Sequence, residues 1–91
     1  MTGSFFVVFG RPGATPVSRI GITATRKCGS AVTRNRLKRI VREVYRTTDD
    51  AGRPPLDMVV NVRPDAASAP YERLRADLAS RLDELRRRIG A

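Results

Sequence analysis

Apolar and polar positions fall into blocks along the chain, and the period of each block indicates a secondary-structure element. An apolar run over residues 4–9, an alternating pattern over 17–25 and a second apolar run over 56–62 each predict a strand. Residues 10–16 contain two glycines and two prolines, which predicts a loop. The first two strands and this loop are therefore expected to form a hairpin.

Apolar side chains at three- and four-residue spacing predict helices in two other parts of the chain. The first helix should span 31–47, after a turn over 26–30 in which Gly29 is the turn residue and could let the backbone approach a phosphate, and in which Ser30 serves as N-cap. The second should begin near Ser68 and Pro70, after a linker over 48–55 and the third strand. The apolar arc of the first comprises Leu37, Ile40, Val41 and Val44, and the stripe of the second comprises Tyr71, Leu74, Leu78, Leu82, Leu85 and Ile89.

The order strand, strand, helix, strand, helix predicts an α+β fold. The 91 residues suffice for a single domain, 1–91. Two helices can cover one face of a small sheet, which gives a two-layer sandwich. The strands on either side of the first helix should be parallel neighbours, and general handedness rules predict a right-handed crossover between them.

Charge is concentrated in the middle of the chain and suggests a polyanionic partner. The formal net charge is +9, and residues 19–46 hold nine basic side chains against the single acid Glu43. Residues 47–91 carry equal numbers of basic and acidic side chains. A charge that served solubility alone would be spread out, whereas this one is confined to about a third of the chain, which favours a binding surface.

The cations lie on one side of the first predicted helix, opposite its apolar arc. Asn35, Lys38, Arg39, Arg42 and Arg46 share that side, and Arg34 and Arg36 lie near its borders. The head groups could follow a phosphate backbone, and Arg26 and Lys27 stand beside the helix N-terminus, where backbone N–H groups favour phosphate. The alternative is a solvated basic face, but solvated faces usually mix charges of both signs.

The residue inventory limits the chemistry available to the chain itself. Histidine is absent, which excludes His-based acid–base catalysis and His metal ligands. The single cysteine, Cys28, allows no internal disulfide, so we expect a reducing, cytoplasmic setting, with Cys28 as a packing residue. No run approaches the roughly 20 apolar residues of a membrane span. Asp49 and Asp50 are adjacent in a loop and make a poor carboxylate cluster for a metal-dependent nuclease.

The basic stretch resembles a known motif. Arg34-Asn35-Arg36, followed by Lys38-Arg39 and Arg42-Glu43, is similar to the RNR motif of the bacterial ribonuclease P protein component. Further segments also match that family in order and spacing, and the resemblance covers nearly the whole chain. They are Arg19-Ile20-Gly21-Ile22, Arg26-Lys27, Phe6-Val7-Val8-Phe9, Leu56-Asp57-Met58-Val59-Val60 and Tyr71-Glu72.

The resemblance implies a fold and a function. The fold is that of ribonuclease P proteins, similar to a domain of elongation factor G and to part of a ribosomal protein, with a rare left-handed crossover. The function is that of the protein subunit, which binds the catalytic RNA and the 5′ leader of precursor tRNA while the RNA holds the active site and Mg²⁺. The resemblance implies that this chain supplies no catalytic residue and no metal ligand. We also expect no membrane contact, because the predicted helix over 31–47 lacks the belt of bulky aromatic residues that membrane-surface helices favour, and no protein partner is evident from the sequence.

The resemblance also assigns candidate site residues. Phe9 matches an aromatic position of the family's leader cleft, although an aromatic residue at a strand end can equally be a core residue. Phe5 and Phe6 are expected to pack in the core, and Arg86 to Arg88 to form a solvated end of the last helix. The RNA-facing residues are expected to be Arg26, Lys27, Arg34, Asn35, Arg36, Lys38, Arg39, Arg42 and Arg46.

The sequence departs from the family pattern at its start. Family members usually have a basic segment and a short helix before the first strand, whereas here only residues 1–3 precede it. We therefore expect that this helix is missing, either naturally or because the sequence is truncated, and that an apolar patch is exposed where it would pack. Three other functions remain open: a ribosomal protein or general RNA chaperone, a stand-alone nuclease, and a peripheral membrane helix.

Overall fold

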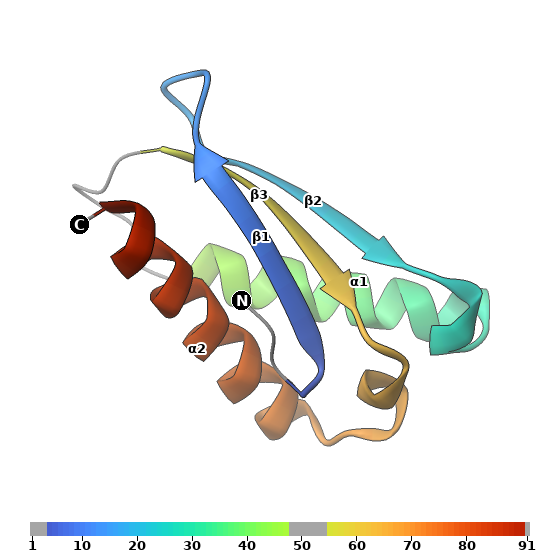
Figure 1. Ribbon diagram of the computed structural model, residues 1–91. Coiled ribbons are helices and arrows are strands. Elements are labelled where there is room, and N and C mark those ends of the chain that lie inside the picture. Colours follow the sequence, from blue (N-terminus) through green and yellow to red (C-terminus); the bar gives the residue numbers. More distant parts are fainter. Residues whose placement is uncertain (1–3, 48–54, 91) are drawn as a thin grey trace.

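The computed structural model describes residues 4–47 and 55–90, and these form a two-layer α+β sandwich, as predicted (Figure 1). The expected linker, apart from Pro55, and the acidic pair Asp49 and Asp50 lie outside the described residues. The elements are β1 (Phe6–Pro12), β2 (Arg19–Ala24), the 3-10 turn η1 (Arg26–Cys28), α1 (Ala31–Thr47), β3 (Leu56–Val62), the 3-10 turn η2 (Pro64–Ser68) and α2 (Tyr71–Gly90).

The three strands form one sheet in the order β1-β3-β2, so the predicted hairpin is wrong. β3 lies between the other two strands, antiparallel to β1 and parallel to β2. β3 buries four apolar side chains, Leu56, Met58, Val60 and Val62, more than either other strand, and this favours its place at the centre of the sheet. β1 ends at Pro12, which cannot donate a ladder hydrogen bond and suits an edge strand.

The chain passes from β2 through α1 to β3, and these two strands are parallel neighbours, as predicted. In Figure 1 α1 crosses behind the sheet, and the connection has the left-handed sense that the family resemblance implies. The general rule for such crossovers predicts the opposite hand. This topology leaves one face of the sheet to the helices and the other open.

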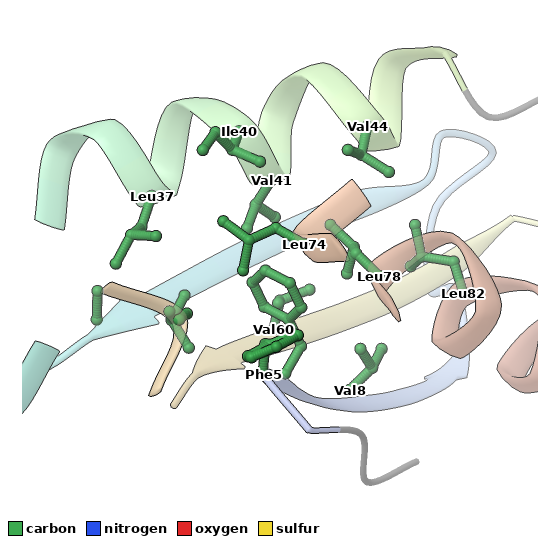
Figure 2. Close-up of a cluster of buried hydrophobic side chains, with 14 of the residues drawn as sticks. Phe5, Val8, Leu37, Ile40, Val41, Val44, Val60, Leu74, Leu78 and Leu82 are labelled. Carbon is green, nitrogen blue, oxygen red and sulfur yellow. The ribbon is translucent and has the colours of Figure 1, made fainter. Parts of the chain in front are cut away.

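The core fills the space between the sheet and the two helices (Figure 2). Phe5 and Phe6 are buried, as predicted, and the Arg73 guanidinium lies 5.3 Å from the centre of the Phe5 ring. The four residues of the predicted α1 arc are all buried. The fully buried side chains include Phe6, Val8, Leu37, Val41, Val60, Leu74, Leu78 and Leu82.

The helix ends agree with the predicted capping residues. The Thr33 backbone N–H donates to Ser30 Oγ at 3.3 Å, and the N–H groups of Arg73 and Leu74 both donate to the Pro70 carbonyl at 3.1 Å. Two expectations for α2 are wrong. Tyr71 is 43% exposed, because it starts the helix beyond the core, and Arg86 is only 6% exposed, because it follows Leu82 by one helical turn on the buried side.

Candidate nucleic-acid interface

The first candidate surface is the outer side of α1, here called the α1 cationic face. Its apolar arc packs against the sheet and α2, so the opposite side points to solvent. Within 4–47 and 55–90, none of its side chains forms an ion pair with a carboxylate. Exposed members are Asn35, Arg36, Arg39, Arg42 and Arg46, and partly buried members are Arg34 and Lys38.

The turn η1 adds two exposed cations, Arg26 and Lys27, directly before α1. Between them and the helix, Cys28 is buried and its S–H donates to the Val62 carbonyl at 3.3 Å, which fastens the turn to the end of β3. Gly29 has φ 120°, a conformation that L side chains rarely adopt, so it is a turn residue as predicted. The fold thus brings these two cations to the end of the α1 cationic face.

The second candidate surface is the open face of the sheet, on the side away from the helices. Alternation along each strand places every second residue on this face. The strand register then aligns these residues in rows across the sheet. The rows are Arg11–Asp57–Arg19, Phe9–Val59–Gly21 and Val7–Asn61–Thr23.

The middle row forms the floor of a shallow groove of about 470 Å³. Phe9 is 54% exposed and its cross-strand partner Val59 is 44% exposed. Gly21 leaves the third place of the row empty, because a Cβ there would be 3.9 Å from the Met58 carbonyl oxygen and 4.0 Å from Val59 Cγ2. Phe9 is therefore exposed in the groove and is not packed in the core, and its role in a leader cleft stays a prediction.

An exposed apolar patch was also expected, and Phe9 and Val59 are an exposed apolar pair on this face. That a further helix packs there stays a prediction. An exposed aromatic ring beside an empty glycine position can accept a flat ring, and nucleobases stack on aromatic side chains in many single-strand-binding proteins.

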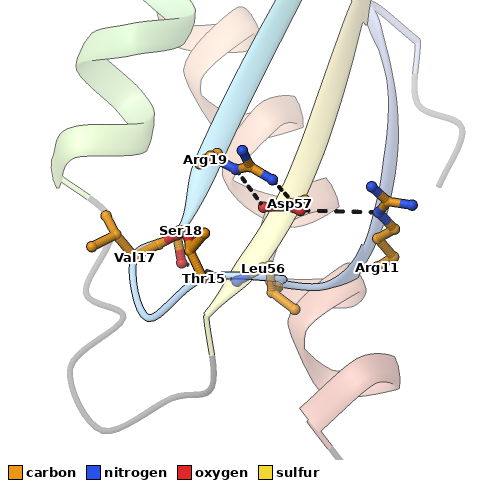
Figure 3. Close-up of polar contacts among 7 residues, drawn as sticks. All are labelled: Arg11, Thr15, Val17, Ser18, Arg19, Leu56 and Asp57. Carbon is orange, nitrogen blue, oxygen red and sulfur yellow. Dashed lines mark hydrogen bonds and ion pairs between the residues drawn. The ribbon is translucent and has the colours of Figure 1, made fainter.

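The neighbouring row forms a polar end of the groove (Figure 3). Arg19 Nε donates to Asp57 Oδ1 at 3.0 Å, and Arg19 Nη2 donates to Oδ2 at 2.9 Å. Arg11 Nε lies 3.9 Å from the same Oδ2. The hydrogen bonds from Arg19 are the main cause that lowers the pKa of Asp57 below its ordinary value; partial burial opposes them, and the Ala14 backbone N–H and Arg11 add to the lowering.

Sequence reasoning missed this polar end. Sequence reasoning treated Arg19 as one cation of the basic stretch and Asp57 as a strand residue, each within a segment that matches the family, and did not pair them. The two residues are 38 positions apart, and only the register of β2 on β3 places them opposite each other. The pattern of either segment alone could not identify this pairing.

The two candidate surfaces lie on opposite sides of the molecule. The α1 cationic face points away from the sheet, and the groove lies on the sheet face that the helices leave open. The structure therefore places Phe9 on a different face from the basic candidates on α1. Such an arrangement can contact two RNA segments at once.

Other site chemistries find no support in the described part of the chain. None of the helices there is long and apolar enough to cross a membrane. The same residues contain no group of three His, Cys, Asp or Glu side chains that could hold a metal ion.

Comparisons with known proteins agree on one family. The family model described as Ribonuclease P matches residues 1–86. The ribonuclease P protein component of Desulfatibacillum aliphaticivorans is 40% identical over 87 residues, which are 96% of this chain and 70% of that protein. Other curated relatives match over about half of their length, such as 48% for the Dictyoglomus thermophilum protein component.

Solved structures give the same result for the fold. The RNase P protein from Thermotoga maritima, in complex with 1-(4-fluorophenyl)-2-thiourea, is 33% identical with a TM-score of 0.78, and the match covers 96% of this chain and 82% of that chain. The Staphylococcus aureus RNase P protein has a TM-score of 0.85 at 24% identity, over 100% of this chain and 82% of that one.

Proposed function

Because this chain belongs to the bacterial ribonuclease P protein family, we propose that it is the protein subunit of a ribonuclease P ribonucleoprotein in the cytoplasm. In this role it binds the catalytic RNA and the 5′ leader of precursor tRNA. It thereby assists the endonucleolytic removal of the leader during tRNA maturation.

The α1 cationic face is the observation that carries the proposal. It presents basic side chains along one side of a 17-residue helix, and no carboxylate among the described residues pairs with them. Each phosphate that such a side chain neutralises releases counterions, so affinity for RNA should fall steeply with salt. Arginine suits this role because its planar fork can bridge two phosphate oxygens. We assign this face, with Arg26 and Lys27, to the catalytic RNA.

The groove on the open face is assigned to the leader. Its apolar floor, with the exposed ring of Phe9, suits a single-stranded segment whose bases are free to stack. Its polar end carries the exposed side chains of Arg11 and Arg19, which suit the backbone of the same strand. A protein that holds the leader beside the catalytic RNA strengthens substrate binding through proximity.

The chemistry is assigned to the RNA subunit. Within the described residues, no group of three His, Cys, Asp or Glu side chains could hold a metal ion. We place the Mg²⁺ on the oxygen atoms of the RNA and the substrate. The protein's part is to bind and to position, and it donates no catalytic group.

The proposal is tested by the affinity of the holoenzyme, reconstituted with a bacterial ribonuclease P RNA, for two ligands. One is precursor tRNA with its leader and the other is the matching mature tRNA. We expect the protein to tighten binding of the precursor much more than binding of the mature tRNA. Equal tightening of both would contradict the leader assignment, and no association with the RNA would contradict the subunit assignment.

A further inference from the structure

Asp57 is an acidic residue in a groove that we assign to a polyanion, and a carboxylate there should repel RNA. Its side chain is only 14% exposed, whereas the side chains of Arg19 and Arg11 on either side are 60% and 76% exposed. A strand entering the groove therefore meets guanidinium groups before it meets the carboxylate. The cluster as a whole keeps a positive charge, because two arginines surround one acid.

The carboxylate is fixed from the protein side. The backbone N–H of Ala14, in the connection between β1 and β2, helps to lower the pKa of Asp57. This connection crosses the start of β3, as Figure 3 shows, and it is fastened there at two points. The Gly13 N–H donates to the Pro55 carbonyl at 2.8 Å, and the Leu56 N–H donates to Ser18 Oγ at 3.1 Å.

The fixed carboxylate determines how Arg19 is oriented. Arg19 uses Nε and Nη2 on Asp57, so the Nη1 amino group lies on the edge of the guanidinium that does not contact the carboxylate. A fork held in this way loses little conformational entropy when it binds a second anion. The row that contains Phe9 and Gly21 lies two residues along each strand, or about 7 Å away. This span is comparable to the distance from a nucleobase to its own phosphate.

We propose that Asp57 is a positioning residue that holds the guanidinium group of Arg19 at the polar end of the groove, where Arg19, with Arg11 beside it, binds a backbone phosphate of an RNA strand whose base lies over Phe9. The proposal rests on the leader assignment made above and extends it to a residue of the opposite charge. Asp57 itself makes no contact with RNA.

The competing explanation is that the Arg19–Asp57 pair only joins β2 to β3. The two explanations predict opposite signs for Asp57→Asn. This substitution raises the formal net charge above +9, and charge alone should then strengthen RNA binding. If Asp57 positions Arg19, the same substitution weakens binding of the leader despite the added positive charge.

Asp83→Asn is the matched control. Asp83 also forms an ion pair with an arginine, Arg87, at 3.0 Å. Asp83→Asn changes the net charge by the same amount as Asp57→Asn. This pair lies on α2, outside the residues that line the groove. We expect Asp57→Asn to weaken the holoenzyme's binding of precursor tRNA by roughly tenfold, as for the loss of one charge-assisted contact. Binding of mature tRNA should be unchanged, and Asp83→Asn should weaken neither.

A chemical change in the ligand separates positioning from a loss of stability. Each ligand in this series is a precursor tRNA in which one leader phosphate is replaced by a neutral methylphosphonate. The wild-type holoenzyme should bind one of these ligands more weakly than the unmodified precursor, and the Asp57→Asn holoenzyme should bind that ligand and the unmodified precursor equally well. Arg19→Lys keeps the charge but loses the fork, and it should reproduce the defect. If Asp57→Asn does not fold, Arg19→Lys is measured in its place, with Arg87→Lys as the control.

Two results would overturn the inference while leaving the proposed function intact. One is that Asp57→Asn binds precursor tRNA as tightly as wild type or more tightly. The other is that wild type and variant are equally sensitive to the methylphosphonate. If instead the wild-type holoenzyme does not distinguish precursor from mature tRNA, the leader assignment fails first, and with it the inference.

Discussion

Filling the empty place in the middle row of the open face should block the leader without harming the fold. Gly21→Val adds a side chain at a position where a Cβ meets only ordinary van der Waals neighbours, at 3.9 Å and 4.0 Å. The γ-methyl groups would then stand in the hollow beside Val59 and Phe9. The backbone of Gly21 is not in the left-handed region, so valine meets no conformational strain there.

Gly21→Val is expected to maintain or raise stability and to weaken binding of precursor tRNA. Glycine in a strand costs about 0.5–1 kcal/mol relative to alanine, and valine suits strands better still, so Gly21→Val should fold as stably as wild type or more so by about 1 kcal/mol. Stacking of one base contributes about 1–3 kcal/mol. Loss of that contact corresponds to roughly a 5–150-fold weaker affinity for precursor tRNA.

The assay compares unfolding in urea with the holoenzyme's affinity for precursor and mature tRNA. Gly21→Ala should give an intermediate loss of precursor affinity. Thr23→Val places the same side chain on the same strand and face, one row outside the groove lining. It should leave precursor affinity unchanged and have only a small effect on stability. A stable Gly21→Val variant that binds precursor tRNA as tightly as wild type would refute the placement of the leader over this row.

Three further predictions concern the α1 cationic face, the core and pH. Arg36→Ala and Arg39→Ala should each weaken binding to ribonuclease P RNA by about 1–2 kcal/mol and reduce the slope of log K against log salt by about 0.7–0.9. Filter binding across a salt series measures both quantities, and unchanged affinity in both variants would exclude this face. Leu78→Ala, at a position with 0% exposure, should lower the free energy of unfolding by about 2–5 kcal/mol in urea titrations, and a loss well below 1 kcal/mol would contradict the packing described. Because the pKa of Asp57 is lowered in the folded state, its ionised form contributes stability above the ordinary aspartate pKa of about 3.9, and this contribution is lost as the pH falls through the lower folded-state value. The difference in unfolding free energy between wild type and Asp57→Asn should therefore be constant near neutral pH and shrink on acidification. A difference that grows in acid would be inconsistent with the ion pair.

Local signals in the sequence were enough to predict the helices and the central strand. The spacing of Leu37, Ile40, Val41 and Val44, with Ser30 before them, gave α1 with its observed bounds and its buried side. The bounds of β3 also agree with the sequence prediction. These features depend on neighbours within a few residues, and such neighbours are visible in the sequence.

Features that depend on distant partners could not be predicted. The hairpin was wrong because nothing in the segments before and after Gly13 indicates that β3 inserts between them. The groove and its polar end follow from that insertion, which places Asp57 between Arg11 and Arg19. Arg86 was misjudged because its charge suggested solvent, whereas its helical position faces the packed side.

The candidate site residues divide in the same way. The basic residues of α1 were predicted to share one solvent-facing side, and the helix places them there. Their contact with RNA stays a prediction. The position of Phe9 was open in the sequence, and it depended on which face of the sheet the helices cover.

The most direct test is cleavage of a precursor tRNA by a bacterial ribonuclease P RNA at low magnesium concentration, with and without this protein. We expect the protein to restore correct 5′ cleavage that the RNA alone performs poorly under these conditions, and to cleave nothing when the RNA is omitted. A folded protein that leaves the RNA's cleavage unchanged, or that cleaves precursor tRNA by itself, would contradict its role as the positioning subunit of a ribonuclease P.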